Sequence, residues 1–259
     1  LQFGYSYFLH MFVIDSKMFY AFSLVSGAAV PSETKGQSDE SRPSDFHCDF
    51  DDAICQGALK AHPTWQKEAL EAIEHSWRGY SNGTAFGADA VDVVTGEIGQ
   101  AWIGVGAFMI DSLTTLWLAG LHDEFNRCVA HIKELDWSRS IDKLDSFFEI
   151  TIRFLGGLLG AYNLSGEKVL LEKAVDLADR LLTGFSSDSP FPYPKINLVS
   201  GQTGWSWHGV EKYDLAEIGS FQLEFIQLTY HTGDPRYKKA AERATAALMS
   251  QGHALIANV

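Results

Sequence analysis

Cysteine, proline and basic side chains are scarce in this chain of 259 residues. Three cysteines are too few for a small fold built on disulfides, and seven prolines exclude a collagen-like or proline-rich chain. Twenty basic residues against 33 acidic ones give a net charge of −13, which argues against nucleic acid or an anionic membrane surface as a partner. A hydrophobic content of 46% excludes intrinsic disorder and provides one substantial core.

The first 30 residues are strongly apolar, and their only ionisable side chains besides tyrosines are His10, Asp15 and Lys17. Met18 to Val30 has the character of the apolar region of a signal peptide, ending in small residues. We therefore expect residues 1–30 to be a leader for the secretory pathway. A signal anchor in the membrane is the second interpretation, and translated upstream sequence without a folded role is the third.

Residues 31–60 are predicted to be an acidic linker, because Ser, Glu, Asp, Gly and Pro dominate and no periodicity is present. Potential metal ligands gather near its end, from His47 to Cys55, but without a recognised ligand spacing. A Cys48–Cys55 disulfide or two free thiols is therefore favoured over a metal site. Cys128 falls in a helical pattern and is predicted to be a small buried apolar residue.

From Pro63 onward the hydrophobic periodicity is helical, with little strand signal. The apolar segment Trp102–Leu121 is long enough to span a membrane, but its glycines and its Asp-Ser-x-Thr-Thr cluster favour a buried helix of a large helical protein. The predicted helices are His62–Tyr80, Trp102–Leu121, Asp123–Leu135, Phe147–Tyr162, Glu167–Leu182, Tyr213–Tyr230 and Pro235–Met249.

These helices alternate in character, and the alternation is a repeat. An apolar helix ends at a turn containing Gly120, Gly166 or Gly233, and an amphipathic helix follows at once. Glycine suits the left-handed position that closes a helix, and the acidic residue after it suits the first turn of the next helix. Hairpins with apolar inner and amphipathic outer helices predict an all-α protein, either a solenoid or a closed α/α barrel.

Charged side chains interrupt two of the apolar helices. Glu149 and Arg153 lie four residues apart on one face of an otherwise apolar helix. If that face is enclosed, burial would raise the pKa of the Glu149 carboxyl while Arg153 would lower it. A functional pair and a structural buried pair are both compatible with this pattern.

The helix predicted at 213–230 repeats this feature, with Glu217, Ser220 and Glu224 on one face, and Asp111 is a third carboxylate on an inner helix. Inner-helix carboxylates would line the cavity of a barrel, an arrangement suited to acid/base chemistry on a neutral polar ligand. Trp205 and Trp207, in the loop 200–209 that precedes this helix, could stack on a sugar or could anchor the loop to the barrel rim.

At these residues the sequence resembles glycoside hydrolase family 47, the class I α-1,2-mannosidases. The segment 148–159, Phe-Glu-Ile-Thr-Ile-Arg-Phe-Leu-Gly-Gly-Leu-Leu, resembles the Phe-Glu-x-x-Ile-Arg-x-x-Gly-Gly-Leu-Leu signature of the family. Segment 109–117 is similar to its Ile-Asp-(Ala/Ser)-Leu-Asp-Thr-Leu motif, segment 192–201 to its Pro-Tyr…Asn-Leu…Gly loop, and segment 215–225 to its Ala-Glu-x-Gly…Leu-Glu-Phe helix. The resemblance extends from Pro63 to Met249.

The resemblance implies an (α/α)7 barrel enzyme that removes terminal α-1,2-linked mannose from high-mannose N-glycans in the ER or Golgi, with inversion of configuration. It implies a calcium ion at the barrel floor. It places the catalytic acid on Glu149, and Arg153 and Glu217 on positions around the substrate.

This sequence also departs from the family pattern. Thr114 stands where the family has a second aspartate, and segment 87–91 matches its Gly-x-Asp-Glu-Leu motif with two changes. The family's further acidic residues and its calcium-binding threonine belong to a C-terminal half with no counterpart before Val259. Residues 61–259 are therefore expected to form about half of the barrel, without a metal ligand, and to be poorly soluble alone. An alternative to the enzyme is a catalytically impaired glycan-binding or ER quality-control protein, and a further one is a helical-repeat scaffold.

Two N-glycosylation sequons are present, Asn82-Gly83-Thr84 and Asn163-Leu164-Ser165. The first is expected in an exposed loop and the second near a helix end. Both are compatible with passage through the secretory pathway.

Overall fold

The computed structural model describes residues 63–205 and 212–256. The predicted leader, the linker, the Cys48–Cys55 pair and Trp207 lie outside this part of the chain. The described residues form two compact units, residues 63–74 with 118–120 and residues 75–117 with 121–256. The first unit consists mainly of the start of a helix, where Lys67 and Glu71 form an exposed ion pair of 3.6 Å.

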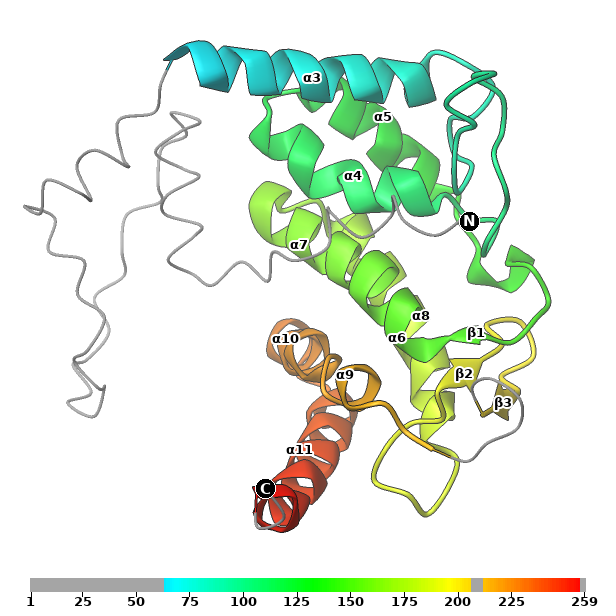
Figure 1. Ribbon diagram of the computed structural model, residues 1–259, viewed down its shortest axis with the longest axis vertical. Coiled ribbons are helices and arrows are strands. Elements are labelled where there is room, and N and C mark those ends of the chain that lie inside the picture. Colours follow the sequence, from blue (N-terminus) through cyan, green and yellow to red (C-terminus); the bar gives the residue numbers. More distant parts are fainter. Residues whose placement is uncertain (1–62, 206–211, 257–259) are drawn as a thin grey trace, which may run out of the picture. The chain divides into compact units, whose positions relative to one another are not determined.

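The described chain is mostly helical, and a small sheet is its only other regular element (Figure 1). The α-helices are α3 (Pro63–Ser81), α4 (Ala107–Leu118), α5 (His122–Lys133), α6 (Phe147–Ile150), α7 (Gly156–Ser165), α8 (Lys168–Leu182), α9 (Leu215–Ile218), α10 (Gln222–Thr232) and α11 (Pro235–Ile256). The shorter elements are the 3-10 turns η1 (Trp137–Arg139) and η3 (Thr183–Phe185), the π-helical turn η2 (Thr151–Leu155), and the strands β1 (Asp145–Ser146), β2 (Lys195–Ile196) and β3 (Thr203–Gly204).

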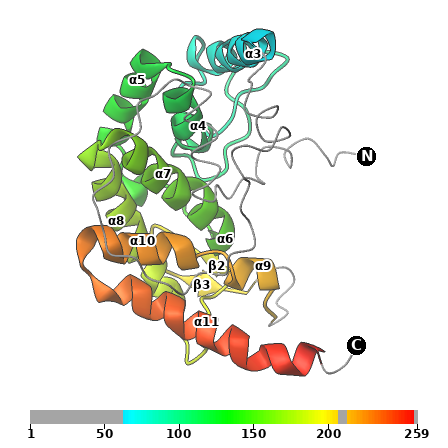
Figure 2. The ribbon, with the colours of Figure 1, turned by 90° about the vertical axis from the view of Figure 1, so that its left-hand side faces the viewer.

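The predicted succession of helical hairpins is confirmed. The pairs α4–α5, α7–α8 and α10–α11 each join an apolar helix to an amphipathic one through a short turn (Figures 1 and 2). The residues that close the first helix of each pair are Gly120, Gly166 and Gly233, with φ of 76°, 75° and 75°. A side chain would be strained in this left-handed conformation, so glycine fixes the place where each hairpin turns.

The apolar helices α4, α7 and α10 lie next to one another, with α7 between the other two in both views (Figures 1 and 2). Glycines on α7 allow this approach. A Cβ atom at Gly157 would lie 3.0 Å from the backbone oxygen of Ile110 on α4, and one at Gly156 would lie 3.4 Å from Glu224 Oε1 on α10. The amphipathic helices α5, α8 and α11 pack behind these three through their apolar faces.

The core of the second unit is filled mainly by aromatic and branched aliphatic side chains. Cys128 is fully buried and is a free thiol, which confirms its predicted role as a small apolar residue. The largest fully buried side chains are Trp137, Tyr80, Tyr237, Phe125, Phe147, Phe154, Phe221 and Phe225.

The prediction of one helix from Trp102 to Leu121 is wrong at its start, because helix α4 begins only at Ala107. Gly104 and Gly106 adopt left-handed φ values of 83° and 86°, which break the helical path. The carboxylate of Asp89 accepts hydrogen bonds from the backbone amides of residues 102, 104, 105, 106 and 107. One buried acidic side chain therefore organises the whole loop that leads into α4.

The helix predicted at Tyr213–Tyr230 is also wrong, because the structure divides it into α9 and α10. Gly219 leaves the helical path with φ −107° and ψ 10°. The Ser220 hydroxyl donates to the carbonyl of Ala216, and the Gln222 amide donates 2.9 Å to the carbonyl of Ile218. Side chains thus satisfy carbonyls that a continuous helix would have used, and α9 ends there.

The small antiparallel sheet, ordered β1–β2–β3, was not evident from the sequence. Each strand has two residues, too short for a period-2 pattern to be recognised. In the register, Asp145 pairs with Ile196 and Ser146 with Lys195. The sheet thereby fixes the chain just before α6.

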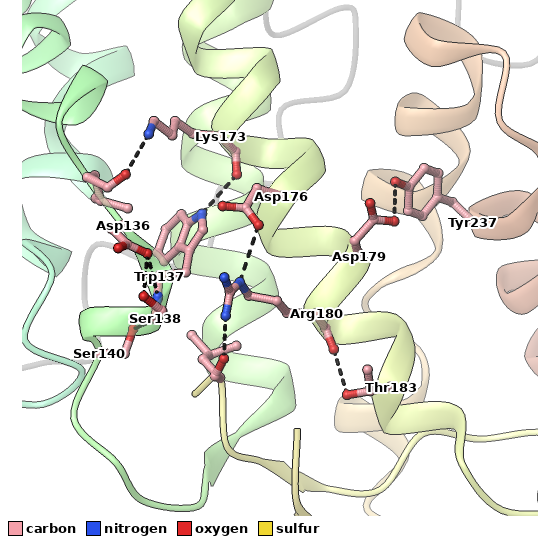
Figure 3. A network of polar contacts seen from close by, with 12 residues as sticks. Asp136, Trp137, Ser138, Ser140, Lys173, Asp176, Asp179, Arg180, Thr183 and Tyr237 are labelled. Atoms are coloured by element: carbon pink, nitrogen blue, oxygen red, sulfur yellow. Dashed lines mark hydrogen bonds and ion pairs between the residues drawn. The ribbon is translucent and has the colours of Figure 1, made fainter. Parts of the chain in front are cut away.

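Helix α8 is tied to its neighbours by polar contacts (Figure 3). Trp137 donates its indole N–H to the carbonyl of Lys173 at 3.1 Å, and Arg180 donates to the carbonyl of Leu198 at 2.8 Å. On the side of α11, the Tyr237 hydroxyl donates to Asp179 at 3.0 Å. These contacts stabilise the outer helices. None of the helices in the described part of the chain has the length and apolarity of a membrane span.

Candidate active site

The charged residues predicted on the inner helices meet in one cluster. Arg153 donates from Nε to Glu149 Oε2 at 2.6 Å and from Nη1 to Asp111 Oδ2 at 3.3 Å, linking η2 to α6 and α4. The three side chains are half-buried, with exposures of 20% for Arg153, 32% for Glu149 and 27% for Asp111. Burial would lower the pKa of Arg153, but Glu149 and then Asp111 outweigh it and raise the pKa, so the guanidinium is a permanent cation.

The backbone around this cluster is unusual. Residues Thr151–Leu155 form a π-helical turn between α6 and α7, in the middle of the predicted helix Phe147–Tyr162. At the start of α6, the hydroxyl of Ser146 accepts a hydrogen bond of 3.2 Å from the amide of Glu149. Single π turns inside helices occur frequently at functional sites. Here the π turn carries Arg153 and follows directly on the helix that carries Glu149.

The indole ring of Trp102 lies beside the cluster of Arg153, Glu149 and Asp111. The guanidinium carbon of Arg153 lies 5.8 Å from the centroid of the Trp102 ring, within the range of a cation–π contact. The indole N–H donates to Asp145 at 2.6 Å, and the ring packs on Phe154 at 5.5 Å between centroids. Trp102 could not be recognised as a site residue from the sequence, because its role depends on its contact with Arg153, 51 positions along the chain.

Glu217 lies within electrostatic range of Glu149, although the two belong to different helices. Burial raises the pKa of Glu217, and the charges of Asp214 and Glu149 add to the increase, whereas Lys195 opposes it. Among the described residues, Oε2 of Glu217 is buried and has no hydrogen-bond partner. The structure therefore brings together Glu149, Arg153 and Glu217, the three side chains singled out from the sequence.

Lys195 is a neighbour of the cluster that could not be predicted from the sequence. On strand β2 it pairs with Ser146 of β1, so the two side chains lie on the same face of the sheet. The Ser146 hydroxyl contacts the first turn of α6, where Glu149 lies. On strand β3, Lys195 pairs with Gly204, which has no side chain. The Lys195 ammonium lies close enough to Glu217 to oppose the increase in the pKa of that carboxyl. No motif marked it, because strand β2 could not be recognised from sequence.

Glu224 occupies the inner side of α10. Burial raises its pKa to about 7, and within the described chain its Oε2 has no hydrogen-bond partner. The predicted single face with Glu217 and Ser220 is wrong, because the break between α9 and α10 separates them. The Ser220 hydroxyl is engaged at the end of α9.

Thr114 and Trp205 have structural contacts. A Cβ atom at Gly160 would lie 3.1 Å from Thr114 Cγ2, so this threonine packs where α4 meets α7. The ring of Trp205 packs edge-on against Tyr193 and Tyr213, at 5.2 and 5.1 Å. These contacts support the loop-anchor interpretation of Trp205.

The acidic side chains of the cluster do not form a donor set for a metal ion. Over residues 63–205 and 212–256, no three His, Cys, Asp or Glu side chains come together in a way that could hold a metal. Asp111 and Glu149 are both engaged by Arg153. The side chains that the structure describes therefore do not form a calcium site.

The chemistry of the cluster is that of paired carboxylates. Glu149 is held by Arg153, and the second carboxyl nearby, Glu217, has a raised pKa. Of two such carboxyls, one can donate a proton while the other binds hydroxyl groups. The cluster holds Arg153 as its cation and a tryptophan at its edge, a combination suited to a neutral polyhydroxylated ligand.

Comparisons of the sequence and of the structure with known proteins point to the same family of glycosidases. The sequence model described as Glycosyl hydrolase family 47 matches residues 72–257. The chain is 40% identical over 185 residues to mannosyl-oligosaccharide 1,2-alpha-mannosidase MNS1 of Arabidopsis thaliana. It is 38% identical over 181 residues to the endoplasmic reticulum mannosyl-oligosaccharide 1,2-alpha-mannosidase of Rattus norvegicus. The solved alpha-1,2-mannosidase from Trichoderma reesei superposes with a TM-score of 0.62 at 30% identity.

The matches cover most of this chain and a minor part of the relatives. The Arabidopsis alignment spans 71% of the chain and 32% of that protein, and the rat alignment 70% and 27%. The structural match covers 70% of this chain and 40% of the Trichoderma enzyme. The chain thus spans less than a third of the length of these two curated relatives.

Proposed function

Because the chain belongs to glycosyl hydrolase family 47, we propose that it is part of a mannosyl-oligosaccharide 1,2-α-mannosidase. The proposed reaction is the hydrolysis, with inversion, of terminal α-1,2-linked mannose on high-mannose N-glycans. The observation that carries the proposal is the half-buried Glu149–Arg153–Asp111 cluster with Glu217 beside it.

In this proposal Glu149 is the general acid. Its ion pair with Arg153 uses Oε2, and Oε1 is left for the transferred proton. The glycosidic oxygen takes this proton as its bond to C1 breaks, and a water molecule attacks C1 from the opposite face, as in inverting glycosidases. A second carboxylate removes a proton from that water, and we assign this base to sequence beyond the described residues.

Arg153 and Glu217 have binding roles in the proposal. The guanidinium holds Glu149 in place through Nε, and its positive charge attracts the oxygen atoms of sugar hydroxyls beside the cluster. The carboxyl of Glu217 accepts hydrogen bonds from hydroxyl groups, and its buried, unpartnered Oε2 within the described chain is the atom that a hydroxyl would satisfy.

The setting of the enzyme is part of the same proposal. We assign residues 1–30 to a leader or membrane anchor, 31–60 to a linker and 61–259 to part of the barrel domain, in a protein of the ER or Golgi. Support comes from the apolar N-terminal sequence and from the rat relative, whose name places it in the endoplasmic reticulum.

The test is hydrolysis of a high-mannose glycan by a form of the protein that includes any sequence flanking residues 1–259, with added calcium. Proton NMR of the released mannose reports its anomer as it forms. The proposal predicts the β anomer first. Release of α-mannose first, or calcium-dependent cleavage of other linkages only, would contradict it.

A catalytically impaired glycan-binding protein is the second candidate. The observation that favours it is Thr114, whose methyl packs at the α4–α7 contact where the family resemblance places a carboxylate. Binding of the high-mannose glycan without release of mannose would select this candidate, and turnover would reject it.

A further inference from the structure

We propose that Asn82 is a site of N-linked glycosylation, with a lipid-linked pyrophosphate oligosaccharide as the donor. The sequon Asn82-Gly83-Thr84 begins in the bend directly after helix α3 ends at Ser81. The side chains of Asn82 and Thr84 are both exposed. The inference rests on the secretory location in the proposed function, and it adds a modification that the catalytic cluster does not require.

The local backbone holds this sequon at the surface. The amide of Asn82 donates to the carbonyl of Arg78 at 3.1 Å, and Arg127 donates to the carbonyl of Ser81 at 3.0 Å. A Cβ atom at Gly83 would lie 3.2 Å from the carbonyl oxygen of Gly96. The backbone of the sequon therefore rests against its neighbours at Gly83, while the residues on either side of Gly83 are open to solvent. A large hydrated oligosaccharide on Asn82 would extend into water without displacing a core contact.

The second sequon provides an internal comparison. Asn163 lies within helix α7, where its Oδ1 forms a contact of 3.0 Å with Nε2 of His231 on α10. The hydroxyl of Ser165, the third sequon residue, donates to the carbonyl of Ala161 at 2.7 Å. The Asn163 side chain is therefore used in the α7–α10 contact, and the Ser165 hydroxyl is used by the backbone of α7 itself. We therefore expect one glycan, on Asn82.

The step is an exchange of bonds at the anomeric carbon of the donor sugar. A bond forms between Nδ2 of Asn82 and C1 of the oligosaccharide, and the bond from C1 to the pyrophosphate oxygen breaks. The lipid pyrophosphate leaves with the electron pair, and the amide gives up one proton to solvent. No oxidant or reductant is needed.

The experiment is translation of the full chain in the presence of microsomes, in one arm with its own N terminus and in the other with a strong heterologous signal peptide. Protease protection reports entry into the lumen, and peptide N-glycosidase reports the glycan as a loss of mass on a gel. We expect one glycan in every protected chain, lost in Asn82→Gln and Thr84→Ala, kept in Thr84→Ser and unchanged in Asn163→Gln.

The two arms separate the two proposals. A protected chain without glycan, or a single glycan lost in Asn163→Gln, overturns the assignment to Asn82. If only the arm with the added signal peptide is protected and carries the Asn82 glycan, the acceptor assignment stands and the proposed secretory location fails.

Discussion

Asp89 shows how one residue can organise a loop that periodicity misreads. Burial alone would raise the pKa of its carboxyl, but hydrogen bonds from the backbone amides of Ala107, Gly104, Trp102 and Gly106 outweigh burial and lower the pKa. Its side chain is 8% exposed, so solvent cannot replace these donors. The sequence offered a weak motif at segment 87–91, but the partners lie 13 to 18 residues away and are backbone amides, which carry no sequence signal.

Replacing Asp89 with asparagine is therefore expected to lower the free energy of unfolding by about 3 kcal/mol at pH 7, because hydrogen bonds to a buried charge are lost. Since the folded-state pKa is lowered, the stabilisation is present above the ordinary carboxyl pKa, 3.8, and is lost as pH falls through the folded value. Urea titrations between pH 2 and pH 7 measure this. The control is Asp188→Asn at an exposed loop position, and equal effects of the two substitutions would refute the assignment.

The ionisation of Glu224 affects the stability of the fold in the opposite direction to that of Asp89. Because burial raises its pKa from 4.5 to about 7, the unfolded chain ionises before the folded chain as pH rises. The resulting cost to stability grows between these two pH values and is constant above them. Glu224→Gln should therefore raise the free energy of unfolding by about 3 kcal/mol at pH 8 and have little effect at pH 4. The same pH dependence in the exposed α8 variant Glu172→Gln would show that the effect does not come from Glu224.

At the scale of elements, the glycines of α7 set how closely the inner helices approach. A Gly→Ala change in a helix normally gains up to about 1 kcal/mol. At Gly79 in α3 the new Cβ would meet nothing within 4 Å, so we expect that gain. At Gly157 the new Cβ would meet the Ile110 carbonyl at 3.0 Å, and backbone cannot move aside easily, so we expect a loss of about 2 kcal/mol. Thermal unfolding of the two variants decides the point, and a stabilised Gly157→Ala would contradict the observed packing.

The elements also show where sequence reasoning succeeds and where it stops. The hairpin turns were predictable because glycine at positions such as Gly166 has a local cause, the left-handed conformation. The break at Gly219 and the π turn at Thr151–Leu155 were not, because apolar periodicity continues across both. The Glu149–Arg153 pair was predicted from its spacing of four residues and is present, whereas the neighbouring Lys195 depends on a strand pairing invisible in two-residue segments.

At the scale of the molecule, α10 exposes an apolar stripe to solvent. Leu223, Ile226 and Tyr230 lie on one face of α10 and are 63%, 45% and 83% exposed. Contiguous exposed apolar surface promotes association. We expect residues 1–259 expressed alone to self-associate, and replacement of all three side chains with glutamine to restore a monomer in light scattering. Val93→Ser with Val94→Ser is the control, since these two are 91% and 90% exposed but do not extend the stripe. A monodisperse wild-type monomer would contradict this prediction.

The order of the motifs along the chain carried the prediction of the whole fold. Five segments matched one family in sequence order, and the superposition on the Trichoderma enzyme confirms the partial barrel. The predicted leader and linker gain no structural test, because residues 1–62 lie outside the described part. Composition alone suggested one globular domain with a substantial core, whereas the motifs indicated about half of a larger barrel.

Glu149 is the proton donor in the proposed reaction, and a comparison of Glu149→Gln with the wild type on a high-mannose glycan tests this role. A general acid contributes about 10²- to 10⁴-fold. We predict that kcat falls by about 10³-fold while the glycan is bound with a similar Kd, and that the exposed control Glu172→Gln keeps full activity. Full turnover by Glu149→Gln would show that the acid lies elsewhere.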